Sequence, residues 1–319
     1  MKEGYRVVVI GGGPAGITAG LYCARSGLDV VLIERGVIGG QITNAAQVEN
    51  YPGFPQGISG IELGQRMHEQ ATGYGLETLF AEVIGLIPHV ARQIRRSKGQ
   101  DSVPGHLVST SEGDFIAKSV IIASGSQFRK LSVPGEAELA GKGVSYCATC
   151  DGPFFRDKAV AVIGGGDTAL TEAIYLSKFA SKVSIIHRRD ELRASKVLQK
   201  KAETEPKIDF VWNAVVDRIE GEGTVRQLRL RNTKDGIISL LPADGVFIAV
   251  GVEPETGYLQ GILPLDEKGR IITNEVMETR IPGILAAGDV RHNSARQAIT
   301  AAGDGATAAL SAERFVSSL

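Results

Sequence analysis

The chain has 319 residues, and at about 150 residues per domain this length predicts two domains. Its 35 Lys and Arg nearly balance its 36 Asp and Glu, for a formal net charge of −1, which argues against a nucleic-acid-binding protein. Hydrophobic residues make up 43% and charged residues 22%, proportions that exclude a disordered chain. The 40 glycines exceed the average share, and we expect them at tight turns and where the backbone approaches a ligand.

The cysteine count and the N-terminus predict a cytoplasmic protein. Three cysteines are too few for a disulfide framework, and the N-terminus lacks the pattern of a signal peptide. The stretch Val7–Ala24 carries no charge over 18 residues, but five glycines and Pro14 interrupt it. We therefore expect a buried strand, a turn and a helix there, and no association with a membrane.

The N-terminal part of the chain has the pattern of a strand–helix–strand unit. A glycine-rich turn, Gly11–Gly16, joins a buried strand over 6–10 to a helix, and a second strand over 30–33 ends at Glu34. In this Gly-x-Gly-x-x-Gly pattern the first glycine allows the turn, the second lets the backbone approach a pyrophosphate, and the third lets helix and strand pack closely. The pattern predicts a dinucleotide site at the helix N-terminus.

The same order of elements returns in the middle of the chain. A strand over 158–163 leads into the turn Gly164–Ala169 and a helix, and the next strand, over 183–186, ends at His187. From the first glycine of the turn to the residue that ends the second strand is 23 positions in both copies. This repeat predicts two domains of similar architecture, against the alternative that two common units resemble each other by chance.

Short apolar strands that close on glycine flank the second copy, at 119–125 and 245–251. We therefore predict an α/β fold of two Rossmann-like dinucleotide-binding domains, the second inserted into the first. The outer domain is predicted to consist of residues 1–125 and 248–319, and the inserted domain of residues 126–247. The polar stretch Ser97–His106, with Gly and Pro, predicts a surface hairpin loop.

The residues that end the second strands predict different ligands. Glu34 can accept hydrogen bonds from a ribose diol and would repel a 2′-phosphate, as suits the adenosine end of FAD or NAD. At the same place in the second copy stand His187, Arg188 and Arg189, with Arg193 one helical turn further on. Guanidinium groups bind a ribose 2′-phosphate through charge-assisted bonds, so we predict NADPH rather than NADH. The alternative is a solvated basic loop balanced by its own acids.

Cys147 and Cys150 form a Cys-x-x-Cys pair that Asp151 follows directly. Zinc would need four ligands, and Cys23 lies in the first predicted helix with no His beside the pair, so we predict no metal site. A redox dithiol fits better, because such a pair at a helix start stabilises one thiolate beside its partner. Asp151 can then exchange a proton with a thiol if burial raises its pKa, or it can complement the helix dipole.

Together these motifs resemble those of the low-molecular-weight, prokaryotic-type thioredoxin reductases, which are NADPH-dependent flavoproteins. The resemblance covers essentially the whole chain. It rests on the segments Gly11–Gly16, Gly39–Gln41, Val48–Gly53, Cys147–Asp151, Gly164–Ala169, His187–Arg193, Gly288–Val290 and Arg296–Ala298.

The resemblance implies that FAD binds the outer domain and NADPH the inserted one, with Asp289 holding the ribityl chain. The residues implied for FAD are Gly11, Gly13, Pro14, Ala15, Gly16, Glu34, Arg35, Gly39, Gly40, Gln41, Asn50, Val83, Ser124, Gly125, Gly288, Asp289, Arg296, Gln297 and Ala298. Those implied for NADPH are Gly164, Gly166, Asp167, Thr168, His187, Arg188, Arg189 and Arg193.

The activity that the resemblance implies is that of a thioredoxin-disulfide reductase. Electrons pass from NADPH through FAD to the Cys147–Cys150 disulfide and then to the disulfide of thioredoxin. By the family motif, Cys150 is the thiol beside the flavin, Cys147 attacks the partner and Asp151 is the acid. The family also implies a homodimer and an inserted domain that swivels about linkers near 119–126 and 242–250.

Three alternatives stay open on the sequence. The same fold can reduce a glutaredoxin-like or peroxiredoxin-linked protein, since partner choice depends on the surface around Cys147. A ferredoxin-driven or dithiol-oxidase relative is the second alternative, against which Arg188 and Arg189 argue. The third is a nonenzymatic redox sensor, against which the intact cysteine pair beside two cofactor sites argues.

Overall fold

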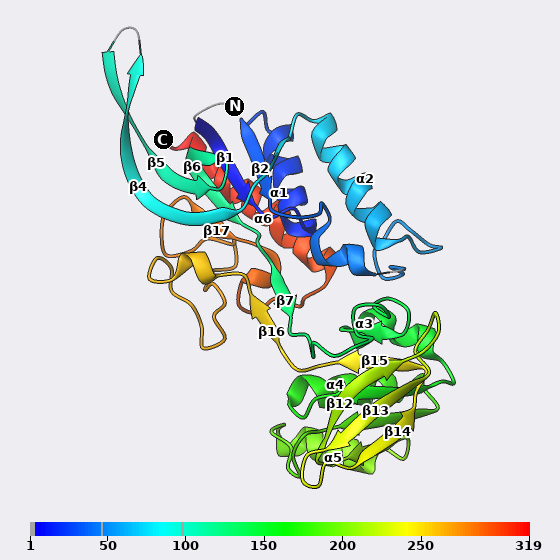
Figure 1. The fold of residues 1–319 in the computed structure, drawn as a ribbon. Coiled ribbons are helices and arrows are strands. Elements are labelled where there is room, and N and C mark those ends of the chain that lie inside the picture. The colour runs from blue at the N-terminus through cyan, green and yellow to red at the C-terminus, as the bar shows by residue number, and fades with distance from the viewer. Residues whose placement is uncertain (1–3, 46, 97–98) are drawn as a thin grey trace. The chain divides into compact units, whose positions relative to one another are not determined.

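The computed structural model describes residues 4–45, 47–96 and 99–319. The chain forms two compact units: unit 1 comprises Met1–Gln127 and Glu253–Leu319, and unit 2 comprises Phe128–Val252 (Figure 1). Each unit is built on a sheet whose central strands are parallel, with helices packed against it. The predicted α/β fold of two Rossmann-like domains, the second inserted into the first, is thereby confirmed.

Unit 1 is built from both ends of the chain. Its helices and strands are β1 (Gly4–Ile10), α1 (Pro14–Arg25), β2 (Val30–Glu34), α2 (Gly60–Gly73), β3 (Glu77–Phe80), β4 (Val83–Arg96), β5 (Gly99–Thr110), β6 (Gly113–Ile122), β17 (Ile284–Ala286) and α6 (Ala298–Ser317). The sheet has the order β3-β2-β1-β6-β5-β4, and β17 also pairs with β6. Strands β1, β2, β3, β6 and β17 are parallel, whereas β4 and β5 pair antiparallel.

The β1 strand of unit 1 is buried on both faces, which explains its unbroken apolar sequence. Val7 and Val9 pack in a cluster with residues of α1 and α6. Val8 and Ile10 point to the opposite face and pack in a second cluster with residues of β4, β5 and β6. Because side chains alternate along a strand, one short run of β-branched residues supplies both cores.

Unit 2 repeats this design with a smaller sheet. Its helices and strands are β8 (Val144–Ser145), α3 (Ala148–Asp151), β9 (Ala159–Ile163), α4 (Asp167–Leu176), β10 (Lys182–Ile186), α5 (Lys196–Thr204), β11 (Ile208–Val211), β12 (Ala214–Glu220), β13 (Gln227–Asn232), β14 (Ile238–Pro242) and β15 (Gly245–Ile248). Its parallel sheet has the order β11-β10-β9-β15-β8, and β12, β13 and β14 form a separate antiparallel sheet.

The β9 strand is the centre of unit 2. Val160 and Val162 pack in one cluster with residues of α3 and α4. Ala161 and Ile163 pack in another cluster with residues of β12 and β13. Helices therefore cover one face of the parallel sheet and the antiparallel sheet covers the other.

Two regions differ from the expectations drawn from the sequence. The stretch Ser97–His106 was expected to be a surface hairpin loop. From Gly99 onward its residues belong to β5, which forms an antiparallel hairpin with β4; residues 97–98 lie outside the described part of the chain. The strand extends through polar residues, Gly and Pro because an antiparallel hairpin does not need apolar residues on both faces. The linkers expected near 119–126 and 242–250 lie partly in β6 and β15. The chain crosses between the units in β7 (Ser126–Phe128) and β16 (Val252–Pro254), which pair with each other.

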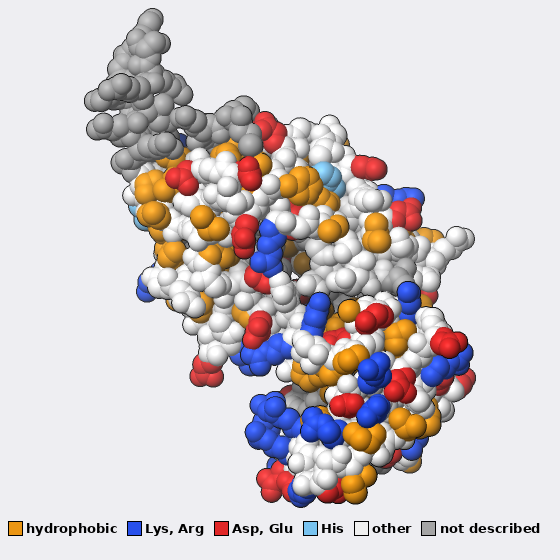
Figure 2. Space-filling view, in the orientation of Figure 1, with side chains coloured by type: hydrophobic (Ala, Val, Ile, Leu, Met, Phe, Trp, Pro, Cys, Tyr) orange, Lys and Arg blue, Asp and Glu red, His pale blue; other side chains and the backbone are white. Residues whose placement is uncertain are grey.

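The surface agrees with the balanced charge of the sequence. On the face shown in Figure 2, side chains of Lys and Arg are interspersed with those of Asp and Glu. The uncharged stretch Val7–Ala24 forms β1, a turn and α1, as predicted. Among the residues that the structure describes, no helix combines the length and the apolar character needed to cross a bilayer.

The close packing of α1 on α6 yields a test of the fold. A Cβ atom at Gly305 of α6 would collide with the backbone carbonyl of Ala15. We expect Gly305→Ala to lower the free energy of unfolding by about 1–3 kcal/mol, because backbone atoms cannot move aside as a side chain can. Gly303 of the same helix has no neighbour within 4 Å of such a Cβ, so Gly303→Ala should be neutral or stabilising by up to about 1 kcal/mol. Urea denaturation of both variants measures the difference, and equal losses would contradict this packing.

Candidate active site

The FAD residues implied for unit 1 gather at the carboxyl ends of its parallel strands. Gly11 follows β1, Glu34 ends β2, Ser124 lies just after β6, and Gly288 lies two positions after the end of β17. In open α/β sheets this edge is where ligands bind. Four separate stretches of sequence therefore converge on one place.

The first glycine turn has the shape that a pyrophosphate needs. Gly11 has φ +106°, in the left-handed region that favours glycine. A Cβ at Gly16 would collide with the carbonyl of Gly11, whereas one at Gly13 would meet nothing closer than the Gly39 carbonyl oxygen at 4.0 Å. The turn is thus closed where α1 packs and open at Gly13, in front of the helix N-terminus, where exposed N–H groups attract phosphate.

Glu34 and the loop after β2 are fixed onto this turn. The Glu34 carboxylate accepts hydrogen bonds from the backbone N–H groups of Gly12 at 2.6 Å and Gly36 at 2.7 Å. The N–H of Gly39 donates to the carbonyl of Gly12 at 2.8 Å. The acid predicted to bind a ribose is therefore held at the turn by backbone donors.

Other implied flavin residues are joined across long sequence distances. The Asn50 amide nitrogen donates to Gln297 Oε1 at 3.2 Å. A Cβ at Gly288 would lie 2.9 Å from the Cβ of Ala15, so the loop after β17 lies against the start of α1. Asp289 accepts a hydrogen bond from the Ser294 hydroxyl at 3.1 Å, and burial raises the pKa of its carboxyl.

The remaining implied flavin residues occupy the surroundings of this edge. The Ser124 hydroxyl donates to the backbone carbonyl of Glu255 at 2.8 Å, and Arg35 forms an ion pair with the Glu255 carboxylate at 3.0 Å. The other positions are Pro14 at the first turn of α1, Gly40 and exposed Gln41 in a short 3-10 helix, Val83 at the start of β4, Gly125 after β6 with φ +70°, and Arg296 and Ala298 on either side of Gln297.

An ion pair that the sequence analysis missed supports the loop of Asp289. Asp304 of α6 accepts two hydrogen bonds from Arg291, at 2.7 and 2.8 Å, and a third from the N–H of Gly288 at 3.1 Å. The two side chains are only 15% and 12% exposed. A bidentate pair at low exposure fixes geometry well, but no motif marks Asp304 in the sequence.

The second glycine turn, in unit 2, is closed at its first glycine and open at its second, as the turn of unit 1 is at Gly11 and Gly13. A Cβ at Gly164 would lie 2.6 Å from the Ala249 carbonyl oxygen, while one at Gly166 would have no neighbour within 4 Å. Asp167 begins α4, and its carboxylate accepts a hydrogen bond from the N–H of Ser195 at 2.7 Å. Thr168 follows it and is exposed.

The three predicted arginines share one cavity of about 300 Å³. Arg188, Arg189 and Arg193 all line it, together with residues of the β13–β14 turn. His187 does not line the cavity; its ring is buried against Gly165, with Nε2 3.0 Å from the Glu191 carbonyl oxygen. Burial lowers the pKa of this imidazole, so it packs beneath the arginine loop as a neutral group near pH 7.

Cys147 and Cys150 form a disulfide at the start of α3, with 5.3 Å between their Cα atoms. Cys147 is the N-cap residue, and its sulfur lies 3.2 Å from the N–H of Cys150. Cys23, by contrast, is buried in the core of unit 1, where burial raises the pKa of its thiol to about 12. Among the described residues, no group of three or more His, Cys, Asp and Glu side chains is arranged to hold a metal ion.

Asp151 is linked to this pair through a residue that the sequence analysis missed. The Ser145 hydroxyl donates to Asp151 Oδ2 at 2.6 Å and accepts from the N–H of Cys147 at 3.1 Å. Burial raises the pKa of Asp151, and the bond from Ser145 opposes that rise. A carboxyl whose pKa is raised retains a proton to higher pH than an exposed one, as an acid beside a thiol requires. The sequence signal for Ser145 was only its position two residues before the pair.

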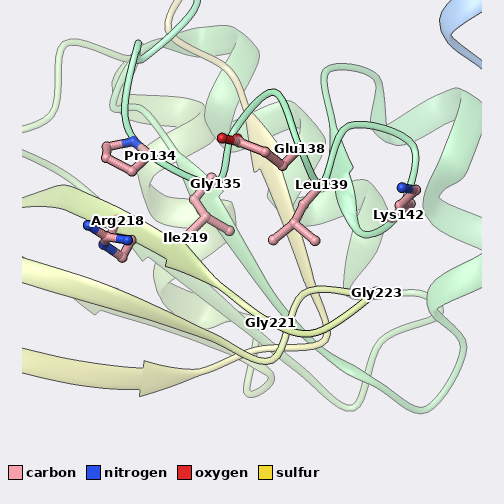
Figure 3. A pocket seen from close by; sticks show the side chains of 9 residues that line it. All are labelled: Pro134, Gly135, Glu138, Leu139, Lys142, Arg218, Ile219, Gly221 and Gly223. Carbon is pink, nitrogen blue, oxygen red and sulfur yellow. The ribbon is translucent and has the colours of Figure 1, made fainter.

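A second cavity in unit 2, of about 340 Å³, contains none of the predicted site residues (Figure 3). It is lined by Pro134, Gly135, Glu138, Leu139, Lys142, Arg218, Ile219, Gly221 and Gly223. Its charged groups, Glu138, Lys142 and Arg218, are all exposed, so nothing in its lining selects a ligand.

Comparison with known proteins shows the family of this chain. A family model described as pyridine nucleotide-disulphide oxidoreductase matches residues 5–305. The thioredoxin reductase of Listeria innocua is 45% identical over 316 residues, which cover 99% of this chain and 95% of that protein. The chain belongs to the thioredoxin reductase family.

Solved structures of thioredoxin reductases agree with this assignment. The crystal structure of the enzyme from Streptococcus pyogenes is 43% identical, with a TM-score of 0.92 and full coverage of both chains. That from Giardia duodenalis is 36% identical, with a TM-score of 0.89, and covers 99% of this chain and 100% of its own. The resemblance drawn from the motifs is thereby confirmed, and the chain is a disulfide oxidoreductase of this family.

The hydrogen bond from Ser145 predicts a shift in the pH dependence of disulfide reduction. If protonated Asp151 supplies a proton, the rate falls as pH rises through the pKa of this carboxyl. Removing the donor in Ser145→Ala raises that pKa further, so the fall in rate should move to higher pH. Ser145→Thr retains a hydroxyl and should keep the wild-type pH profile. Asp151→Asn has no carboxyl to titrate, so this fall in rate with rising pH should be absent. An unchanged profile in Ser145→Ala, measured as kcat against pH, would show that the bond does not act on the acid.

Proposed function

We propose that the protein reduces the disulfide of thioredoxin, with electrons passing from NADPH through FAD to the Cys147–Cys150 disulfide. The observation that carries the proposal is this disulfide at the start of α3, beside a buried acid, in a chain with two dinucleotide-binding folds. Bound FAD would supply the acceptor for hydride from NADPH, which no amino-acid side chain provides.

Unit 1 has the features expected of an FAD site. The open position at Gly13 and the N-terminus of α1 suit a pyrophosphate. Glu34 retains acceptor capacity for a ribose diol while its two backbone donors fix its orientation. The joined Asn50 and Gln297 side chains offer polar groups to the flavin end, and Asp289 offers an acceptor for the ribityl hydroxyls.

Unit 2 has the features expected of an NADPH site. Gly166 leaves room for the pyrophosphate at the start of α4. Arg188, Arg189 and Arg193 line one cavity at the end of β10, and their guanidinium groups suit the dianionic 2′-phosphate that distinguishes NADPH from NADH.

The cysteine pair carries out thiol–disulfide exchange once it is reduced. The Cys147 thiolate attacks one sulfur of the partner's disulfide, and the departing partner thiolate takes a proton from Asp151. The Cys150 thiolate then attacks Cys147 in the mixed disulfide, which closes the intramolecular disulfide and releases the second partner thiolate. Two electrons leave the pair, and the partner's disulfide becomes a dithiol. The roles of Cys147, Cys150 and Asp151 follow the family motif.

The same resemblance supports proposals on partners and location. We propose thioredoxin as the protein substrate, a homodimer built mainly by unit 1, and a cytoplasmic enzyme. A net charge of −1 supports a function without nucleic acid. A glutaredoxin-like or peroxiredoxin-linked substrate is tested by turnover with each candidate under NADPH.

Serine substitution of either cysteine of the pair tests the proposed electron route. In protein loaded with FAD, Cys147→Ser and Cys150→Ser should each reduce thioredoxin turnover to background, because exchange needs both sulfurs. Anaerobic NADPH should still bleach the flavin absorbance of both variants. Cys23→Ala, which removes the third, buried sulfur, is the matched control and should retain turnover. Activity in either serine variant, or protein that never takes up FAD, would contradict the proposal.

Substitution of Arg188 and Arg189 tests the choice of nucleotide. The double change to Ala should raise the KM for NADPH by about 10- to 100-fold, which corresponds to a loss of about 1.4–2.7 kcal/mol of binding free energy for the two exposed guanidinium groups together. The KM for NADH should change less than about threefold. Arg229→Ala removes an arginine of the same unit that pairs with Asp217 at 3.2 Å, and it should affect neither nucleotide. Equal increases for both nucleotides would reject the 2′-phosphate assignment.

A further inference from the structure

The cavity that holds the three arginines is completed by a turn from elsewhere in unit 2. Lys234, in the turn between β13 and β14, lines the same cavity of about 300 Å³ as the arginine loop. The charged residues of the lining are Arg188, Arg189, Asp190, Glu191, Arg193 and Lys234. Two carboxylates therefore stand among the cations, in a place where a phosphate would meet them.

The turn that carries Lys234 is ordered by its own hydrogen bonds. The N–H of Lys234 donates to Asn232 Oδ1 at 2.8 Å, and the N–H of Ile237 donates to Asp235 Oδ1 at 2.9 Å. Gly236 has φ +76°, which allows the turn to close. The backbone N–H of Asn232 then donates a hydrogen bond to the Ile237 carbonyl at 2.9 Å. Asn, Asp and Gly at these positions are the residues that such a turn favours.

This turn is also attached to the arginine loop. The N–H of Thr233 donates to the Asn213 carbonyl at 2.7 Å, and its hydroxyl donates to the Arg188 carbonyl at 3.2 Å. The N–H of Asn213 donates to the Arg189 carbonyl at 3.2 Å. The backbone next to Lys234 is therefore fixed relative to the backbone of two arginines that line the cavity.

Lys234 forms an ion pair with Asp190, with 2.7 Å between Nζ and Oδ2. The two side chains are 63% and 64% exposed, so the pair contributes little to folding stability. The hydrogen bond from Lys234 lowers the pKa of Asp190, so this carboxylate keeps its charge beside Arg189. Without the lysine, that charge would repel an incoming phosphate and compete for the neighbouring guanidinium groups.

We propose that Lys234 is a specificity-determining residue for the 2′-phosphate of NADPH, because it neutralises Asp190 and adds a fourth cation to the cavity. The proposal rests on the proposed use of NADPH and extends it to a residue outside the arginine loop. The lysine acts on the 2′-phosphate alone, since the rest of the nucleotide is assigned to the glycine turn of unit 2.

The test compares two adenosine nucleotides that differ only in the 2′-phosphate. Calorimetry of the FAD-loaded protein at low salt measures binding of adenosine 2′,5′-bisphosphate and adenosine 5′-monophosphate. Lys234→Met keeps the aliphatic stem without its charge; it should weaken bisphosphate binding about 3- to 10-fold and change monophosphate binding less than about twofold. The salt dependence of bisphosphate binding should decrease as well. Lys234→Arg, which keeps the charge, should retain the wild-type preference.

Asp190 and a distant lysine supply the matched controls. Asp190→Asn should strengthen bisphosphate binding, and combined with Lys234→Met it should return the affinity to within about threefold of wild type, because the repelling charge and its counter-charge are then both gone. Lys182→Met removes a lysine of the same unit that pairs with Asp209 at 3.2 Å, and it should change neither affinity.

The outcomes separate this proposal from the one on which it rests. Wild-type protein that binds both nucleotides equally contradicts the use of NADPH itself. A second outcome is that the wild-type protein prefers the bisphosphate, but Lys234→Met keeps this preference or weakens the binding of both nucleotides equally. That outcome supports the use of NADPH and overturns the role of Lys234.

Discussion

Parallel pairing of short, doubly buried strands is the constraint on which both nucleotide folds depend. Because the strands of each central sheet run the same way, their carboxyl ends meet at one edge. In unit 1 that edge receives Gly11, Glu34 and Gly288, and in unit 2 it receives Gly164 and the arginine loop. The glycines follow from the same constraint, since the backbone that leaves the neighbouring parallel strand, at Ala123 in unit 1 and Ala249 in unit 2, leaves no room for a Cβ at Gly11 or Gly164.

Features encoded by local spacing could be predicted from the sequence. The glycine turns could be recognised from the spacing of their glycines between a strand and a helix, and the strand–helix–strand order follows from unbroken β-branched runs such as residues 6–10. The cysteine pair could be assigned because three residues are enough to bring both sulfurs together at a helix start. The position of His187 at the end of a strand was also predicted, but its burial beneath the loop was not, since burial depends on the approach of Gly165.

Contacts that depend on distant parts of the chain could not be predicted. Asn50 meets Gln297 across 247 positions, and Asp304 meets Arg291 only because α6 returns along the loop after β17. Ser145 lies close in sequence to the residues it contacts, but no motif distinguishes it from any other small residue; only the structure places its hydroxyl between a backbone N–H and a carboxylate. The hairpin at Ser97–His106 was expected, but the extent of the strand β5 was not, because its pairing with β4 is stabilised by backbone bonds that leave no apolar pattern in the sequence.

The burial of Cys23 has a consequence for an enzyme that handles oxidised sulfur at every turnover. Disulfide scrambling and oxidation to sulfenic acid both start from an accessible thiolate. Cys23 is fully enclosed in the core of unit 1, where its thiol keeps its proton at physiological pH. Cysteine oxidation in this chain is therefore directed to the Cys147–Cys150 pair, where the catalytic cycle itself can reduce the sulfur again.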